Sequence, residues 1–181
     1  MNTDSSIIET NPFEHILYEF TMYIQASCFQ SNNQFVINLC VDSRMVHMRN
    51  LAYFFCPEKT KGKKYLCYTD FILRRLSNEI SGELFDEIQR ITSNATCHLL
   101  KGRFSESFKN ETAVFEQTVF PIFVNLIKDF ITMEKDNVCP KYLAHWRNNI
   151  IQENMYYLIQ LISSLEIEGN TPIVTGTTGN A

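Results

Sequence analysis

Glycine and proline are scarce in this sequence, with 6 Gly and 5 Pro among 181 residues. Folds built from many short strands need these residues in their turns, so their scarcity argues against an all-β protein and favours long helices. The apolar fraction of 45% and the aromatic fraction of 13% exclude a disordered chain. A chain of this length can bury one substantial core. We therefore expect a single all-α domain.

Closely spaced cysteine pairs are also missing. None of the six cysteines belongs to a CxxC or CxxH pair, which is the spacing typical of structural zinc sites. Without a secretory signal, a disulfide framework is not expected either. We interpret the cysteines as reduced thiols and predict no metal and no cofactor. The six cysteines are Cys28, Cys40, Cys56, Cys67, Cys97 and Cys139.

No stretch of the sequence approaches eighteen uninterrupted apolar residues, the length that a membrane-spanning helix needs. The N-terminal residues lack the basic segment and the apolar run of a secretory signal. These two absences predict a soluble, cytoplasmic protein with no membrane partner.

An excess of positive charge is absent as well, since the formal net charge is −4 and the pI is near 5.6. This balance argues against a general nucleic-acid-binding surface. One basic cluster interrupts it, the run EKTKGKK at residues 58–64. Charge runs are commonly solvent-facing loops, and we favour that interpretation here. A phosphate contact is the alternative.

The segment Gln34–Phe55 is the one around which the chain is organised. At 100° per residue, its apolar side chains cover most of a helix circumference, which indicates a helix packed on several sides. Its polar residues fall on two faces, one with Ser43, His47 and Asn50 and the other with Asn38, Asp42 and Arg49. A buried polar group without a partner costs about 1–3 kcal/mol, so we expect these groups to pair with other helices.

Other helices are predicted on both sides of this segment. Asn11 and Pro12 form a strong start signal, an N-cap followed by proline at the first helical position. Periodic apolar residues then predict helices at 12–29, 71–78, 81–100, 110–133 and 140–165. The expected fold is a single-domain bundle of five or six helices over residues 1–165, with a central, mostly buried second helix. Residues 166–181 are expected to form a flexible or extended tail.

Two sets of polar residues are candidates for a functional site. The first is the second-helix set with Arg49, and the second is His98 with Arg103 at the end of the 81–100 helix. If these helices pack together, imidazole and guanidinium groups could converge and act on a phosphodiester without a metal. A satisfied hydrogen-bond network that fixes the helix register is the alternative, and we favour it.

Two segments carry a resemblance to a known group. VDSRMVHMRNLAYFF resembles the signature (E)SFLxHxRNLxxFF of a group of bacterial helical proteins without an established activity, and EIQRITSNATCHLLKGRF resembles their second signature, INxxIxHLTxxR. Asp42 stands where the first signature has an acid before the serine. The resemblance implies an all-helical fold. The matching residues are Ser43, His47, Arg49, Asn50, Leu51, Phe54, Phe55, Ile88, Ile91, His98, Leu99 and Arg103.

A more distant similarity is to HEPN helical bundles, several of which are RNA-cutting toxins. Their characteristic element is an arginine followed four to six residues later by a histidine. Here Arg44 precedes His47 by three residues and Arg90 precedes His98 by eight, and only the reversed order from His98 to Arg103 has that separation. The similarity implies an RNA-directed or nucleotide-binding role.

Two hypotheses follow for the function. The favoured one is a non-enzymatic binding or interaction protein, with a homodimer as one option, in which the polar cluster is structural. The alternative is a HEPN-like, metal-independent enzyme acting on RNA, or a nucleotide-binding protein. Under that alternative the catalytic candidates are His47, Arg49, His98 and Arg103, and the binding candidates are Ser43 and Asn50.

Overall fold

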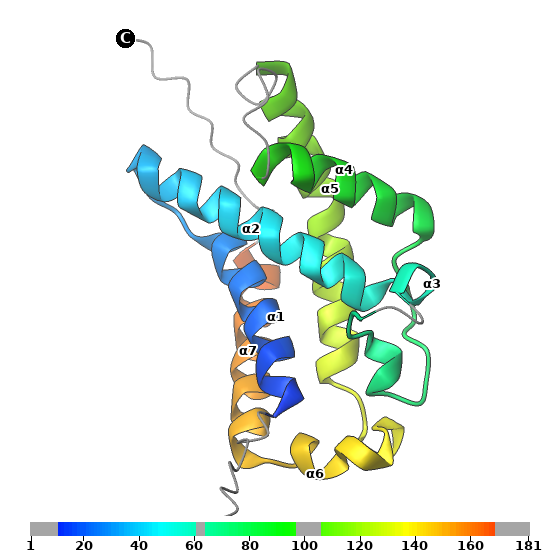
Figure 1. Cartoon of the computed structure of the whole chain (residues 1–181). Coiled ribbons are helices and arrows are strands. Elements are labelled where there is room, and N and C mark those ends of the chain that lie inside the picture. Colours follow the sequence, from blue (N-terminus) through cyan, green and yellow to red (C-terminus); the bar gives the residue numbers. More distant parts are fainter. Residues whose placement is uncertain (1–10, 61–63, 97–105, 169–181) are drawn as a thin grey trace, which may run out of the picture.

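The computed structural model describes residues 11–60, 64–96 and 106–168, and it shows an all-α single domain as the sequence predicts (Figure 1). Seven α-helices lie within these ranges rather than five or six. The expected count is too low because α3 (Pro57–Thr60) and α6 (Leu143–Trp146) are single turns, too short to produce an apolar period. No helix in this part of the chain is long and apolar enough to span a membrane.

The first two long helices begin where the sequence predicts. The Asn11 side chain accepts a hydrogen bond from the Phe13 amide at 3.1 Å and so caps α1 (Pro12–Cys28). In the same way Asn33 accepts from the Phe35 amide at 2.9 Å and caps α2 (Gln34–Phe55). Helix α2 ends at Cys56 because the residue before a proline is driven out of the helical region.

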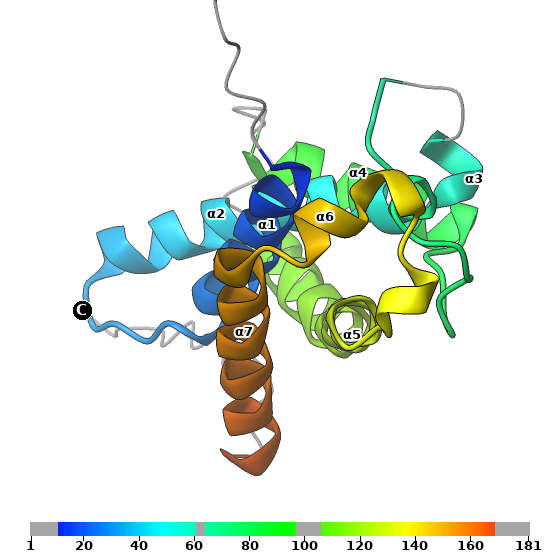
Figure 2. The same cartoon turned by 90° about the horizontal axis from the view of Figure 1, so that it is seen from below.

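Helix α2 crosses α1 and also packs on α3 and on α4 (Gly82–Thr96). Its buried residues begin only at Arg44. In the first half, Phe35 and Leu39 are 69% and 51% exposed, and this end of α2 reaches past the neighbouring helices in both views (Figures 1 and 2). The central position of α2 therefore applies to its second half, while the first half lies at the edge of the bundle.

Aromatic rings fill the core where α1, α2 and α5 (Glu106–Ile131) meet. Phe20 of α1 stacks on Phe55 of α2 with ring centroids 5.7 Å apart, and it meets Phe130 of α5 edge to face at 5.6 Å. Phe54 contacts Phe130 at 5.3 Å. Pairs of this kind contribute about 0.5–1.5 kcal/mol beyond the area that they bury. These contacts fix the crossing of α1 over α2.

The helix predicted at 71–78 is wrong. Phe71, Ile72 and Leu76 are buried, but the backbone here pairs with residues 137–139 instead of with itself. The Leu73 amide donates to the Asn137 carbonyl at 2.7 Å, and the Phe71 carbonyl accepts from the amide of residue 139 at 2.8 Å. The spacing of apolar residues in this segment indicates that its side chains are buried, but it does not indicate a helix. The hydrogen bonds to residues 137–139 determine the backbone conformation.

The single helix predicted at 140–165 is divided. A 3₁₀ turn (Pro140–Tyr142) and α6 lead into a separate helix α7 (Asn149–Glu168), as Figure 2 shows from below. The break follows from Asn148, whose side chain accepts from the Ile150 amide at 2.9 Å and starts a new helix. Helix α7 continues to Glu168, three residues into the expected tail. The rest of that expected tail, 169–181, lies outside the described residues.

Candidate functional site

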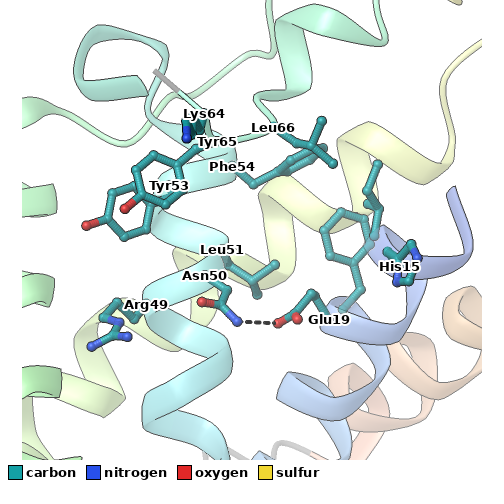
Figure 3. A pocket seen from close by; sticks show the side chains of 12 residues that line it. His15, Glu19, Arg49, Asn50, Leu51, Tyr53, Phe54, Lys64, Tyr65 and Leu66 are labelled. Carbon is teal, nitrogen blue, oxygen red and sulfur yellow. Dashed lines mark hydrogen bonds between the residues drawn. The ribbon is translucent and has the colours of Figure 1, made fainter. Parts of the chain in front are cut away.

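The polar face of α2 meets one carboxylate of α1. His47 is buried, and its Nδ1 lies 2.7 Å from Glu19 Oε2. The Asn50 Nδ2 donates to the same oxygen at 3.1 Å, although Asn50 itself is exposed (Figure 3). The Tyr18 ring covers the imidazole edge to face, with centroids 5.7 Å apart. Two side chains from α2 thus share one acceptor on α1, which ties the two helices together.

The remaining predicted site residues do not join this cluster in the described part of the chain. Ser43 is half-buried, one turn before His47. The Arg49 side chain extends away from Asn50 and Glu19 (Figure 3). His98 and Arg103 lie outside the described residues. The structure therefore brings His47 and Asn50 together through Glu19, and it does not bring Arg49 to the same point.

A second polar pair, between Arg44 of α2 and Glu116 of α5, lies inside the bundle. The Arg44 Nη2 is 2.9 Å from Glu116 Oε2 and its Nε is 3.3 Å from Oε1, with side-chain exposures of 8% and 4%. The Arg44 Nη1 also donates to the Ala26 carbonyl of α1 at 3.5 Å. Burial raises the pKa of Glu116, and the neighbouring guanidinium opposes that rise. This pair joins three helices.

A pocket of about 360 Å³ opens beside the His47 cluster (Figure 3). We call it the α1–α2 pocket, because α1, α2 and the segment 64–66 form its walls. Its volume lies within the range of about 300–1,000 Å³ that is typical of small-molecule sites. The residues that line it are His15, Ile16, Glu19, Phe20, Arg49, Asn50, Leu51, Tyr53, Phe54, Lys64, Tyr65 and Leu66.

One side of the pocket is polar and aromatic. Tyr53 and Tyr65 stack with ring centroids 4.2 Å apart and an interplanar angle of 18°. Burial raises the pKa of Tyr53, the adjacent Tyr65 raises it further, and Arg49 acts against this rise. In Figure 3 the two phenol groups lie between the side chains of Arg49 and Lys64. The arrangement offers hydroxyl donors together with two cations.

The described residues hold no group of three or more His, Cys, Asp or Glu side chains that could bind a metal ion. Cys56 and Cys67 are buried, and burial raises the pKa of the Cys56 thiol. A raised pKa keeps that thiol protonated and makes it a poor nucleophile. The α1–α2 pocket offers a ligand hydrogen bonds, charge and apolar contact.

The chain gives no match to models of protein families, to curated proteins or to solved structures. Its function must therefore be argued from the geometry of the site.

Several of these site residues carry only a weak signal in the sequence. Glu19 is one acid on the border of an amphipathic helix, and Tyr65 follows the lysine cluster without a motif. Glu116 has a recognisable signal, because it is the one charged residue between Glu111 and Lys128 in a predicted helix, whereas Arg44 lies only two residues after Asp42. A buried charge needs a partner, since an unpaired one would be too costly, but the sequence does not identify that partner.

Proposed function

We propose that this chain is a non-enzymatic binding protein whose ligand occupies the α1–α2 pocket. The observation that carries the proposal is that the polar side chains of α2 point in two directions. Arg44 and His47 are turned inward onto carboxylates of other helices and do not line the pocket, whereas Arg49 lines it, as does Asn50, which also donates to Glu19. The inward groups hold the wall of the pocket in place, and the lining groups contact the ligand.

The burial of His47 supports a structural role for this residue. Its side chain is 9% exposed and does not line the pocket. A general acid or base must come within about 2.6–3.2 Å of the atom whose proton it moves, directly or through one water. The near partner of this imidazole is the Glu19 carboxylate at 2.7 Å. The pair therefore orients α1 on α2, and no substrate atom is needed to explain it.

The finer parts of the proposal come from the sequence. They are a cytoplasmic location, membership of the bacterial helical group that the two motifs resemble, and a homodimer as the form in solution. The HEPN similarity would add an RNA-directed activity based on His47, Arg49, His98 and Arg103, and it is the outcome that the experiment must separate from simple binding.

Incubation of the purified protein with total RNA tests the proposal. We expect intact RNA, because the buried imidazole is held by Glu19. We also expect His47→Gln to lower the free energy of unfolding by about 1–3 kcal/mol, the typical loss when a buried hydrogen-bond partner is removed. His145→Gln is the matched control, since His145 is half-buried on α6 and does not line the pocket. RNA cleavage by the wild type that His47→Gln abolishes without lowering Tm would overturn the proposal.

A further inference from the structure

We infer that the α1–α2 pocket binds a small amphiphilic anion: an apolar or aromatic body that carries one carboxylate, phosphate or sulfonate group. This inference rests on the proposed function, because it names the ligand class of the same pocket. It follows from three properties of the lining residues, namely an apolar floor, an excess of positive charge and a carboxylate that is already engaged.

The floor of the pocket is apolar. Ile16 and Phe20 of α1 and Leu51 of α2 line it, and each is at most 5% exposed. Leu66 lies at the rim and is 50% exposed. The floor residues are already packed in the core, so the apolar surface that a ligand can cover lies at the rim, on Leu66 and on Tyr65, which is also 50% exposed. Covering that surface is favourable, so the rim fits a ligand with an apolar body better than a fully hydrated ion.

The charge of the lining is opposite in sign to that of the whole protein. The lining holds two permanent cations, Arg49 and Lys64, and one carboxylate, Glu19, whereas the whole chain carries a formal net charge of −4. Local charge of one sign raises the concentration of oppositely charged ligands at a site. The pocket is thus a cationic region on an acidic protein.

The single carboxylate of the lining is already engaged by α2. Glu19 Oε2 lies 2.7 Å from His47 Nδ1 and accepts a hydrogen bond from Asn50 Nδ2 at 3.1 Å. In Figure 3 Arg49 and Tyr53 lie on the side of α2 away from Glu19, and Lys64 and Tyr65 lie at the end of α2 near Phe54, where Tyr65 stacks on Tyr53. An anion beside these residues meets cations and hydroxyl donors, while the body of the ligand covers the apolar rim.

Two related dyes test the inference. Anilinonaphthalene sulfonate has an aromatic body and one anionic group, and phenylnaphthylamine has the same rings without the charge. We expect the sulfonate to bind the wild type at least about tenfold more tightly than the neutral dye, because only the sulfonate can accept charge-assisted hydrogen bonds from the cations of the pocket. Added salt should weaken the binding of the sulfonate dye and leave the binding of the neutral dye unchanged.

Three variants test which residues of the pocket contact the charged group and the apolar body of the dyes. Lys64→Glu should lower the affinity for the sulfonate dye about tenfold or more and change the affinity for the neutral dye less than about twofold. Lys135→Glu makes the same charge change at an exposed residue outside the pocket and should affect neither dye. Leu66→Ser should weaken both dyes, since it removes apolar surface at the rim. Unchanged circular dichroism establishes that each variant is folded.

The outcomes separate this inference from the proposed function. Equal affinity of the wild type for both dyes, with no effect of Lys64→Glu, overturns the preference for an anion. The pocket is still supported as a binding site in that case if Leu66→Ser weakens both dyes. If neither dye binds the folded wild type, both the inference and the pocket as a site for apolar ligands are overturned.

Discussion

At the scale of single residues, the ion pair between Arg44 and Glu116 lies inside a bundle whose core is mostly apolar. Arg44 and Glu116 are nearly sealed from water, so both give up hydration that their mutual attraction must offset. The guanidinium is matched by both carboxylate oxygens and a backbone carbonyl, which leaves few of its donors unused. Such a pair fixes one arrangement of the helices, because a shifted register would bury two unpaired charges.

Breaking this pair should be far more harmful than replacing it. We predict that Arg44→Met lowers the free energy of unfolding by about 3–5 kcal/mol, because Glu116 is then left buried without its partner. The double variant Arg44→Met with Glu116→Met should recover most of this loss, since an apolar pair of similar volume needs no hydration. Urea unfolding of the four proteins of this cycle measures the coupling.

An exposed arginine provides the control for the Arg44 variants. Arg75 has a side-chain exposure of 84% and lies 3.9 Å from Glu79, so Arg75→Met should change the free energy of unfolding by no more than about 0.5 kcal/mol. A double variant at 44 and 116 that is as unstable as the single one would contradict the interpretation of Arg44 and Glu116 as a replaceable pair.

Asp129 should make the free energy of unfolding depend on pH in a direction that its pKa shift defines. Burial acts to raise its pKa, but hydrogen bonds from Ser77 and Arg74 outweigh burial and lower the pKa below its usual value. A carboxylate with a lowered folded-state pKa adds stability above its unfolded-state pKa of about 3.9, and that stability is lost as the pH falls through the folded-state value.

We therefore predict that Asp129→Asn is less stable than the wild type near neutral pH. The difference in free energy of unfolding should shrink as the pH falls below about 3.9. Comparing the two proteins also cancels the opposite contribution of Glu116, whose raised pKa makes stability fall as the pH rises. Urea titrations at several pH values provide the measurement, and a difference that stays constant with pH would contradict the role given to Asp129.

At the scale of secondary-structure elements, the starts of α1 and α2 were predictable and the irregular connections were not. Asn11 with Pro12 marked the start of α1, because capping depends on neighbouring residues alone. The segment 71–78 was wrongly predicted as a helix, since its conformation depends on pairing with residues more than sixty positions away. Local patterns carry no information about such a partner.

The two asparagine caps should differ in their effect on stability. Asn11 is buried; its side chain caps α1 and its Nδ2 donates to the His145 carbonyl at 3.2 Å. We predict that Asn11→Ala lowers the free energy of unfolding by about 1–2 kcal/mol, because it removes both the capping oxygen and the donor to the His145 carbonyl. Asn33→Ala removes a cap from the exposed half of α2 and should change global stability less.

Hydrogen exchange distinguishes the effects of these two caps. Asn33→Ala should speed the exchange of amides in the first half of α2 while leaving the core amides of α1 protected, because that half contributes little buried surface. Equal losses of global stability in Asn11→Ala and Asn33→Ala would show that the start of α2 is tied into the core as firmly as the start of α1.

At the scale of the whole molecule, the sequence predicted the all-α fold and named only some of the residues that line the α1–α2 pocket. Asn50 and Arg49 were candidates, and Lys64 belongs to the basic run 58–64 for which a phosphate contact was the alternative, but Glu19 and Tyr65 were not candidates. The periodicity of one helix shows which residues share a face, whereas the crossing of α1 and α2 decides what that face meets. That crossing depends on aromatic packing among α1, α2 and α5, which becomes visible only in three dimensions.

We expect the same packing to make the bundle unfold as one cooperative unit, and Trp146 can report on this. This single tryptophan is 4% exposed and meets Phe13 of α1 at 5.1 Å and Phe130 of α5 at 6.1 Å. One hydrophobic cluster contains it together with residues of α1, α2, α4, α5 and α7. We predict that urea unfolding followed by Trp146 fluorescence and by far-ultraviolet circular dichroism gives coincident transitions, as expected for a two-state domain. An earlier fluorescence transition would mean that the α6 end opens separately. Coincidence of the two probes would show that the contacts at Phe13 and Phe130 couple this end to the rest of the core.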